Sequence, residues 1–324
     1  MVKKVKLENL KLLYDLLKRD FMVYAPLKKE NGLVFDLTNK FNLSFLDLGL
    51  TVMPFKNVLL KEIYDVENDP QTQNIALFGL HLCDIKAITI LDGIFKTDPF
   101  YESRRQKMLI IGTECKPTNN CFCELFDANK FTGFDLYIEQ DNEDYKVFAR
   151  SEIGVSYLQK INGKSIYNEK PKPISKENTI LNQNTLINAV NNRLAFEDHW
   201  QAIANNCFGC GACTAVCPLC FCFDIIDKTN PKNGQCHRAR HDDSCFFDKF
   251  SQISNYDFRP KNVDRLYNWY HHKFVRGPKT NGHFLCVGCG RCIDACPANL
   301  NIKKILGFID KEFNNHLTQN EKSI

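Results

Sequence analysis

The stretch NCFGCGACTAVCPLCFCF, residues 206–223, dominates the second half of this chain, because six of its eighteen positions are cysteine. A second stretch, LCVGCGRCIDACPAN at 285–299, repeats most of the pattern. Both fit C-x2-C-x2-C-x3-C-P. The first motif comprises Cys207, Cys210, Cys213 and Cys217, followed by Pro218. The second motif comprises Cys286, Cys289, Cys292 and Cys296, followed by Pro297. One spacing used twice predicts two sites of the same kind.

This is the spacing with which ferredoxins bind [4Fe–4S] clusters. Three closely spaced thiolates bind three corners of the cluster, and the fourth cysteine, before proline, commonly binds the other cluster. We therefore expect a first cluster on Cys207, Cys210, Cys213 and Cys296. We expect a second cluster on Cys286, Cys289, Cys292 and Cys217. The glycines within the motifs allow the backbone to wrap tightly: Gly209, Gly211, Gly288 and Gly290.

Zinc is the alternative metal, because eight cysteines could hold two zinc ions in a zinc-stabilised scaffold. Zinc sites, however, do not need a third cysteine at this spacing and then C-x3-C-P, so the repeat favours iron–sulfur clusters. Residues 218–285 separate the motifs, far more than in a small bacterial ferredoxin. That length resembles the helical two-cluster domains of heterodisulfide reductase and succinate dehydrogenase iron–sulfur subunits.

Composition narrows the class of protein. The chain has 324 residues, enough for two domains, and its net charge of +4 does not indicate a nucleic-acid partner. No apolar run is long enough to cross a membrane, and the N-terminus lacks the features of a signal peptide. Sixteen cysteines in such a chain favour metal or redox chemistry over disulfides. We expect a cytoplasmic protein from an anaerobic setting.

The pattern of apolar residues predicts an α+β fold. Residues 1–155 form a mixed α/β domain that docks partners, 156–185 a polar linker, and 186–324 a mostly helical, two-cluster ferredoxin-like domain. A first helix has its apolar face on Leu10, Leu13, Tyr14, Leu17 and Phe21. Strand-like runs follow: GLVFDLT, NVLL, NIALFGLHL, KMLIIGTE, FDLYIEQ and YKVFARS. Asp84 is placed to cap a helix over CDIKAITILDGIF.

Eight cysteines lie outside the two motifs. Four of them follow strand-like runs of the first domain and could hold a third iron–sulfur cluster or a structural zinc, or be buried thiols: Cys83, Cys115, Cys121 and Cys123. Cys220 and Cys222 either pack near a cluster or form a local redox pair, and Cys236 and Cys245 are expected to be structural thiols.

Residues 259–279, RPKNVDRLYNWYHHKFVRGPK, are basic and aromatic. They could dock an acidic partner face, but a helix that packs its Tyr and Trp side chains inward is the favoured interpretation. We expect His271 and His272 to be packing or surface residues rather than ligands.

Motifs of several enzyme classes are missing. The chain has no G-x-G-x-x-G after a strand, no Walker loop and no G-x-S-x-G turn. We therefore expect no catalytic residue and no flavin or nicotinamide site. Clusters without a catalytic centre predict a protein that conducts electrons between two partners.

Several phrases resemble a known family: VYAPLK, VMPFKNVLLK, FGLHLCDIKAITILD, CPLCFCFDI, FRPKNVDRLYNWYHHKF and CVGCGRCIDACPAN. They resemble the β subunit of cytosolic NiFe hydrogenases of the sulfhydrogenase type, and also the electron-transfer subunit of anaerobic sulfite reductase. The likeness runs over about residues 23–310, whereas GQCHRARHDDSC at 234–245 departs from it. It implies an electron-transfer subunit beside a flavin-binding subunit that uses NAD(P)H. The catalytic arm would be the small and large NiFe hydrogenase subunits or, alternatively, a sirohaem sulfite reductase subunit.

Overall fold

The computed structural model describes residues 1–30, 32–46, 49–60, 73–172, 174, 183–229, 231 and 233–321. These residues divide into two compact units. The first unit is built from residues up to 60, 73–117 and 128–174, and the second from 118–127 and 183–321. The first is a sheet covered by helices and the second is mostly helical, which confirms the predicted α+β class.

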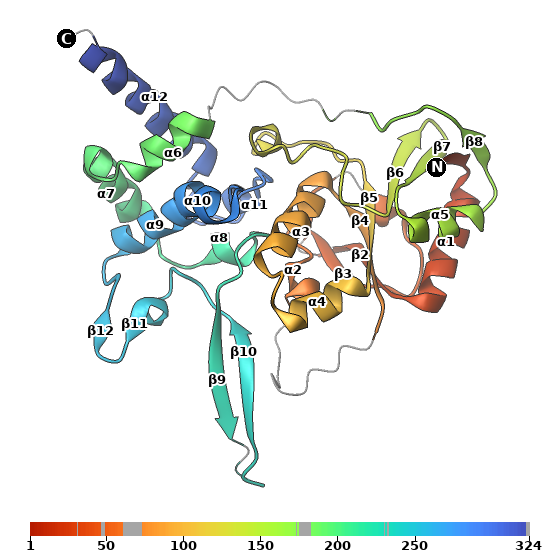
Figure 1. The fold of residues 1–324 in the computed structure, drawn as a ribbon, viewed down its shortest axis with the longest axis horizontal. Helices are drawn as coiled ribbons and strands as arrows, with labels where there is room; N and C mark the ends of the chain where they lie inside the picture. The colour runs from red at the N-terminus through yellow and green to blue at the C-terminus, as the bar shows by residue number, and fades with distance from the viewer. Residues whose placement is uncertain are drawn as a thin grey trace. The chain divides into compact units, whose positions relative to one another are not determined.

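An eight-stranded mixed sheet forms the first unit (Figure 1). Its strands are β1 (Val2–Val5), β2 (Met22–Lys29), β3 (Gly32–Leu37), β4 (Ile75–Leu80), β5 (Met108–Thr113), β6 (Leu136–Asp141), β7 (Asp144–Ala149) and β8 (Lys164–Ile166). The strand order is β3-β2-β4-β5-β6-β7-β1-β8. Neighbours from β2 through β6 are parallel and the outer pairs are antiparallel. Every residue of β4 and β5 is buried, as expected of parallel strands covered on both faces.

Helices of the first unit are α1 (Leu7–Asp20), α2 (Lys56–Leu59), α3 (Leu82–Ile94), α4 (Pro99–Gln106) and α5 (Glu152–Gln159), with a 3₁₀ turn η1 (Leu43–Leu46). The apolar face predicted for the first helix is confirmed, because Leu10, Leu13, Tyr14 and Leu17 are all fully buried. These side chains pack in one core with alternate residues of the sheet, such as Phe78 of β4.

Three local predictions for the first unit differ from the structure. NVLL is not a strand but part of α2, since a four-residue apolar run is too short to separate the two states. Asp84 does not cap α3, which begins at Leu82 with His81 as its N-cap, so Asp84 lies buried in the first turn. The predicted linker 156–185 contains β8, which pairs with β1, among its described residues.

The second unit contains the helices α6 (Gln183–Asn191), α7 (Glu197–Asn206), α8 (Ala212–Ala215), α9 (Asn262–His271), α10 (Gly277–Asn281), α11 (Arg291–Asp294) and α12 (Ile302–Glu321). Shorter turns are η2 (Cys123–Phe126), η3 (Leu194–Phe196), η4 (Asp248–Ser251) and a π-helical segment η5 (His272–Arg276) that continues α9. Trp200, Leu186 and Phe274 lie fully buried in its core. Trp269 and Tyr270 are also buried, which agrees with the inward-facing helix predicted for 259–279.

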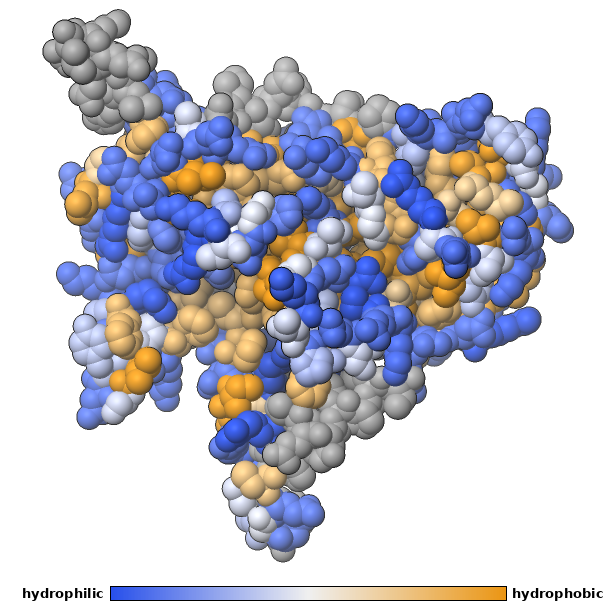
Figure 2. Space-filling view, viewed as in Figure 1, coloured by the Kyte–Doolittle hydropathy of each residue, from blue (hydrophilic) through white to orange (hydrophobic). Residues whose placement is uncertain are grey.

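Two antiparallel hairpins belong to the second unit and were not predicted. They are β9 (Phe223–Thr229) with β10 (Cys236–Asp242), and β11 (Gln252–Ile253) with β12 (Tyr256–Asp257). Figure 1 shows β9 and β10 extending away from the helices of their unit. Every residue of β9 is exposed, and Figure 2 shows hydrophobic side chains along this hairpin. Within the described ranges, no helix is long and apolar enough to span a membrane.

Candidate metal centres

The two cysteine motifs adopt the same backbone conformation. In the first motif Gly209 has φ +63° and Gly211 has φ +74°, and in the second Gly288 has φ +63° and Gly290 has φ +82°. This left-handed region carries little cost only for glycine, which explains why both motifs place glycine at these two positions. A one-turn helix follows each second glycine, α8 in the first motif and α11 in the second.

Backbone amides donate to the cysteine sulfurs at equivalent places in both motifs. Gly209 N lies 3.5 Å from Cys207 Sγ, and Gly288 N lies 3.4 Å from Cys286 Sγ. The last cysteines also each accept a backbone N–H, although from different positions: Leu219 N, two residues on, donates to Cys217 Sγ at 3.4 Å, and Leu300 N, four residues on, donates to Cys296 Sγ at 3.3 Å. Such donors stabilise thiolate, which is the form of cysteine that binds a metal.

The fourth cysteine of each motif lies beside the other motif. One cavity is lined by Cys207, Cys210, Cys213 and Cys296, and Cys292 also reaches its wall. Burial raises the pKa of the Cys207 thiol, and the negative charge of Cys296 raises it further. In the same way burial raises the pKa of Cys286 to about 12, with Cys217 and Cys289 among the neighbours that raise it. Cys296 therefore lies with the first motif and Cys217 with the second, the arrangement that crossed ligation requires.

The residues around these thiols fit an iron–sulfur cluster. The cavity beside the first motif is also lined by five hydrophobic residues: Phe246, Leu266, Trp269, Leu300 and Ile302. Burial raises the pKa of Cys213 to about 12, so the thiol holds its proton until a cation replaces it. Soft thiolate ligands in an apolar shell are the donor set of iron–sulfur clusters, whose potential depends on such burial.

Helix α9 and the π-helical segment η5 place Tyr270 and Lys273 beside cysteines of the two motifs. The Tyr270 ring is buried, and its pKa is raised well above the usual value by burial and then by Cys292 and Cys213. One turn later, Lys273 is only 3% exposed and donates from Nζ to Cys217 Sγ at 3.2 Å. Sequence reasoning missed Lys273. The available signal was its place on the apolar face of the helix, three residues after Tyr270 and seven after Leu266.

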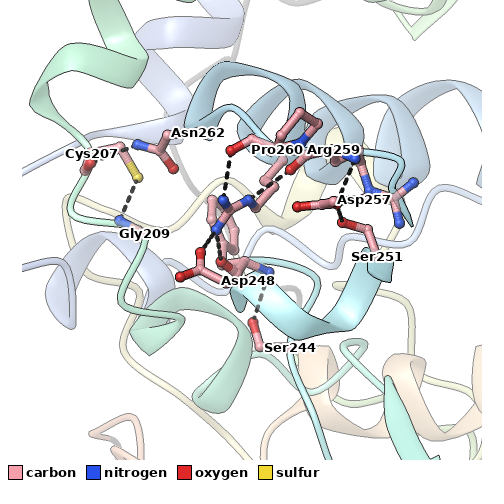
Figure 3. A network of polar contacts seen from close by, with 11 residues as sticks. Cys207, Gly209, Ser244, Asp248, Ser251, Asp257, Arg259, Pro260 and Asn262 are labelled. Atoms are coloured by element: carbon pink, nitrogen blue, oxygen red, sulfur yellow. Dashed lines mark hydrogen bonds and ion pairs between the residues drawn. The ribbon is translucent and has the colours of Figure 1, made fainter. Parts of the chain in front are cut away.

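Asn262, the first residue of α9, holds the start of the first motif in place. Its Nδ2 donates to Ala204 O at 3.0 Å and to Cys207 O at 2.8 Å, and Figure 3 shows it beside Cys207. Arg265, one turn further along, donates to Phe246 O at 3.2 Å and pairs with Asp248. Polar contacts of this helix therefore fix the loops on either side of the first motif.

Residues 118–127 lie directly on the second motif. Phe122 N donates to Gly288 O at 2.7 Å, Cys121 Sγ lies 3.6 Å from Cys289 O, and Asn120 Nδ2 donates to Asp294 Oδ1 at 2.6 Å. A Cβ on Gly288 would come within 2.4 Å of Phe122 O. The predicted cysteines Cys121 and Cys123 thus belong to the second unit, whereas Cys83 in α3 and Cys115 after β5 belong to the first. A third metal site on these four cysteines stays a prediction.

Cys222, one of the two cysteines just after the first motif, hydrogen-bonds with the buried Cys245. This hydrogen bond is the main reason that the pKa of Cys222 falls to about 7, while it raises the pKa of Cys245 well above its usual value. The two predicted alternatives for Cys220 and Cys222, packing near a cluster or forming a redox pair, both stay open. Cys236 is exposed at the start of β10. His272 packs its ring against Phe221, with ring centroids 6.0 Å apart, as expected of a packing residue.

Comparison with known proteins agrees with this geometry. The model of a 4Fe–4S dicluster domain matches residues 206–300, which span both motifs and α9. The sulfhydrogenase 2 subunit beta of Pyrococcus furiosus is 31% identical, over 90% of this chain and 93% of the relative. The chain belongs to the sulfhydrogenase β-subunit family. This confirms the family predicted from the sequence phrases, and the matched dicluster domain supports iron–sulfur clusters in this chain.

Proposed function

We propose that this chain is the electron-transfer subunit of a cytoplasmic NiFe hydrogenase of the sulfhydrogenase type. It would relay electrons between a flavin-binding subunit that uses NAD(P)H and the small and large subunits of the catalytic arm. One observation carries the proposal: the two cysteine loops share their glycine conformations, and the last cysteine of each lies beside cysteines of the other. The name of the Pyrococcus furiosus relative supports the assignment to a sulfhydrogenase.

When bound, each cluster would accept and release one electron at a time. The chain's own residues would supply the ligands of the clusters and their surroundings. Cys207, Cys210, Cys213 and Cys296 would hold the first cluster. Cys286, Cys289, Cys292 and Cys217 would hold the second. Apolar side chains of the second unit pack against most of these cysteines, although Cys210 is exposed, and crossed ligation would tie the two loops together so that little needs to move when charge arrives.

The number of clusters tests the ligand assignment. Two clusters predict about eight irons and eight labile sulfides per chain, and about twelve of each would support a third cluster on Cys83, Cys115, Cys121 and Cys123. We propose two clusters and no flavin or nicotinamide in this chain. Zinc in place of iron, in protein purified without oxygen, would overturn the assignment.

Function is tested by blocking the relay. We expect Cys210→Ala or Cys289→Ala in the intact complex to lower the iron content and to stop electron transfer from NAD(P)H to the terminal acceptor. The matched control is Cys236→Ala, which changes an exposed cysteine outside both motifs. Normal electron transfer by either motif variant with a cluster missing would refute the relay.

Partners are identified by anaerobic capture of the tagged chain from its own host. Recovery of a flavoprotein with NiFe small and large subunits would support the proposal. Recovery of a sirohaem subunit with the flavoprotein would assign the chain to an anaerobic sulfite reductase, and the proposed hydrogenase function would then be wrong.

A further inference from the structure

Lys273 is a buried cation in the core of the cluster-binding unit. It lies in η5, where the helix of α9 widens for one turn, and only 3% of the residue is exposed. Lysine is almost never fully buried in proteins unless it is paired, because removing the ammonium from water is costly. A residue in this position therefore needs a partner that offsets the cost.

The partners of Lys273 are a carbonyl oxygen, a ring and cysteine sulfurs. Nζ donates to Leu285 O at 2.8 Å and to Cys217 Sγ at 3.2 Å, and it lies 5.3 Å from the centre of the Trp269 ring. Within the part of the chain that the structure describes, no carboxylate pairs with it. The counter-charge of this lysine is thus sulfur.

Cys296, the fourth cysteine of the second motif, has no such cation among its described contacts. Cys217 and Cys296 are the fourth cysteines of their motifs, and each accepts a backbone N–H, at 3.4 Å from Leu219 and at 3.3 Å from Leu300. Only Cys217 also accepts from an ammonium group in the part of the chain described. The side chain one turn before Lys273, Tyr270, lines the cavity beside the first motif and carries a phenol rather than an ammonium group. The two sites therefore match in backbone but differ in charge.

We propose that Lys273 raises the reduction potential of the second cluster relative to the first, by holding a positive charge on the ligand Cys217. This inference rests on the proposed function. Reduction adds a negative charge to a cluster, so a nearby cation stabilises the reduced form, and burial strengthens the effect because the local dielectric is low. The second cluster then becomes the easier of the two to reduce, so at equilibrium a single electron on this chain resides mainly on the second cluster.

The test is a redox titration of the purified full chain with its clusters, monitored by electron paramagnetic resonance. Lys273→Met removes the charge and both hydrogen bonds, whereas Lys273→Gln removes the charge and keeps a neutral amide donor on a shorter side chain. In both variants we expect the equilibrium constant for reducing the second cluster to fall about tenfold, which lowers its potential by ~59 mV for a one-electron couple. The potential of the first cluster should change much less, and Lys273→Arg should restore most of the difference.

Controls separate this inference from the proposed function. Lys279→Met removes an exposed lysine of α10 six residues away and should leave both potentials unchanged. The variant Cys210→Ala, combined with each change, leaves only the second cluster and identifies its signal. Unchanged potentials in variants with normal iron content would overturn the inference, and so would iron loss in both Lys273→Met and Lys273→Gln, which would assign Lys273 to cluster assembly. A wild-type chain without clusters would instead refute the proposed function.

Discussion

Asn262 ties the end of helix α7 to the first cysteine of the chain's first motif. Its side-chain amide donates to Ala204 O and to Cys207 O, at 3.0 and 2.8 Å. Both acceptors lie at the C-terminal end of α7, where the last carbonyls of a helix lack the regular donor four residues on, and Ala204 O also accepts from Cys207 N at 3.1 Å. The contact therefore fixes the direction in which the chain leaves the helix and enters the motif.

Asn262→Ala removes both hydrogen bonds, and we expect it to destabilise this junction by about 1–3 kcal/mol because a carbonyl is left without its donor. The first cluster should be lost faster than in wild type when the protein is exposed to a chelator, as followed by visible absorbance. Asn205→Ala, at an exposed position of α7, is the control and should not change that rate. Equal rates for all three proteins would contradict the role of Asn262.

Crossed ligation is tested with pairs of substitutions. Cys210→Ala together with Cys296→Ala should cost about four irons, no more than either change alone, because both cysteines hold the same cluster. Cys210→Ala together with Cys217→Ala should cost about eight, since the two cysteines then belong to different clusters. The opposite result, with the Cys210 and Cys217 pair losing only about four, would show that each motif holds its own cluster.

Gly209 and Gly288 occupy the same place in the two motifs and have the same φ of +63°, but their neighbours differ. A Cβ on Gly288 would lie 2.4 Å from the backbone oxygen of Phe122, whereas a Cβ on Gly209 would meet only the Asn262 side chain, at 3.3 Å. Both alanine variants carry the cost of a left-handed backbone, about 1–2 kcal/mol. We expect Gly288→Ala to be the more destabilising, and thermal inactivation rates measure the difference.

Gly282→Ala is the matched control for that comparison, because Gly282 has φ +70° and nothing within 4 Å of the added Cβ. It reports the backbone cost alone. If Gly288→Ala inactivated no faster than Gly282→Ala, the contact between residues 118–127 and the second motif would not restrain the loop.

The Cys222 and Cys245 pair predicts a pH-dependent reactivity. The pKa of Cys222 lies near 7, below the ordinary 9.0, mainly because Cys245 donates a hydrogen bond to its sulfur. Alkylation by iodoacetamide without oxygen should therefore rise as pH increases through about 7, since the thiolate is the reactive form. In Cys245→Ala the rise should move to higher pH. An unchanged profile in this variant, read by mass spectrometry of the Cys222 peptide, would remove Cys245 as the cause.

Much of the fold follows from local pattern. The helical spacing of Leu10, Leu13 and Leu17 and the continuous apolar runs of β4 and β5 are each visible within about ten residues. The short NVLL run was misread because length alone separates strand from helix in an apolar segment, and four residues do not suffice. The β9–β10 hairpin was missed because every residue of β9 is exposed, so its sequence carries no buried face to detect.

The sequence by itself determined the kind of metal site, because the ligands of each motif lie within eleven residues and their spacing, glycines and proline encode the loop directly. Only the tertiary structure decided what surrounds those ligands. The ammonium of Lys273 on Cys217, the thiol of Cys245 on Cys222 and the backbone of Phe122 on Gly288 join residues 56, 23 and 166 positions apart. Such contacts depend on packing between distant segments, which no local spacing encodes, and they give two cysteine motifs of the same spacing different surroundings.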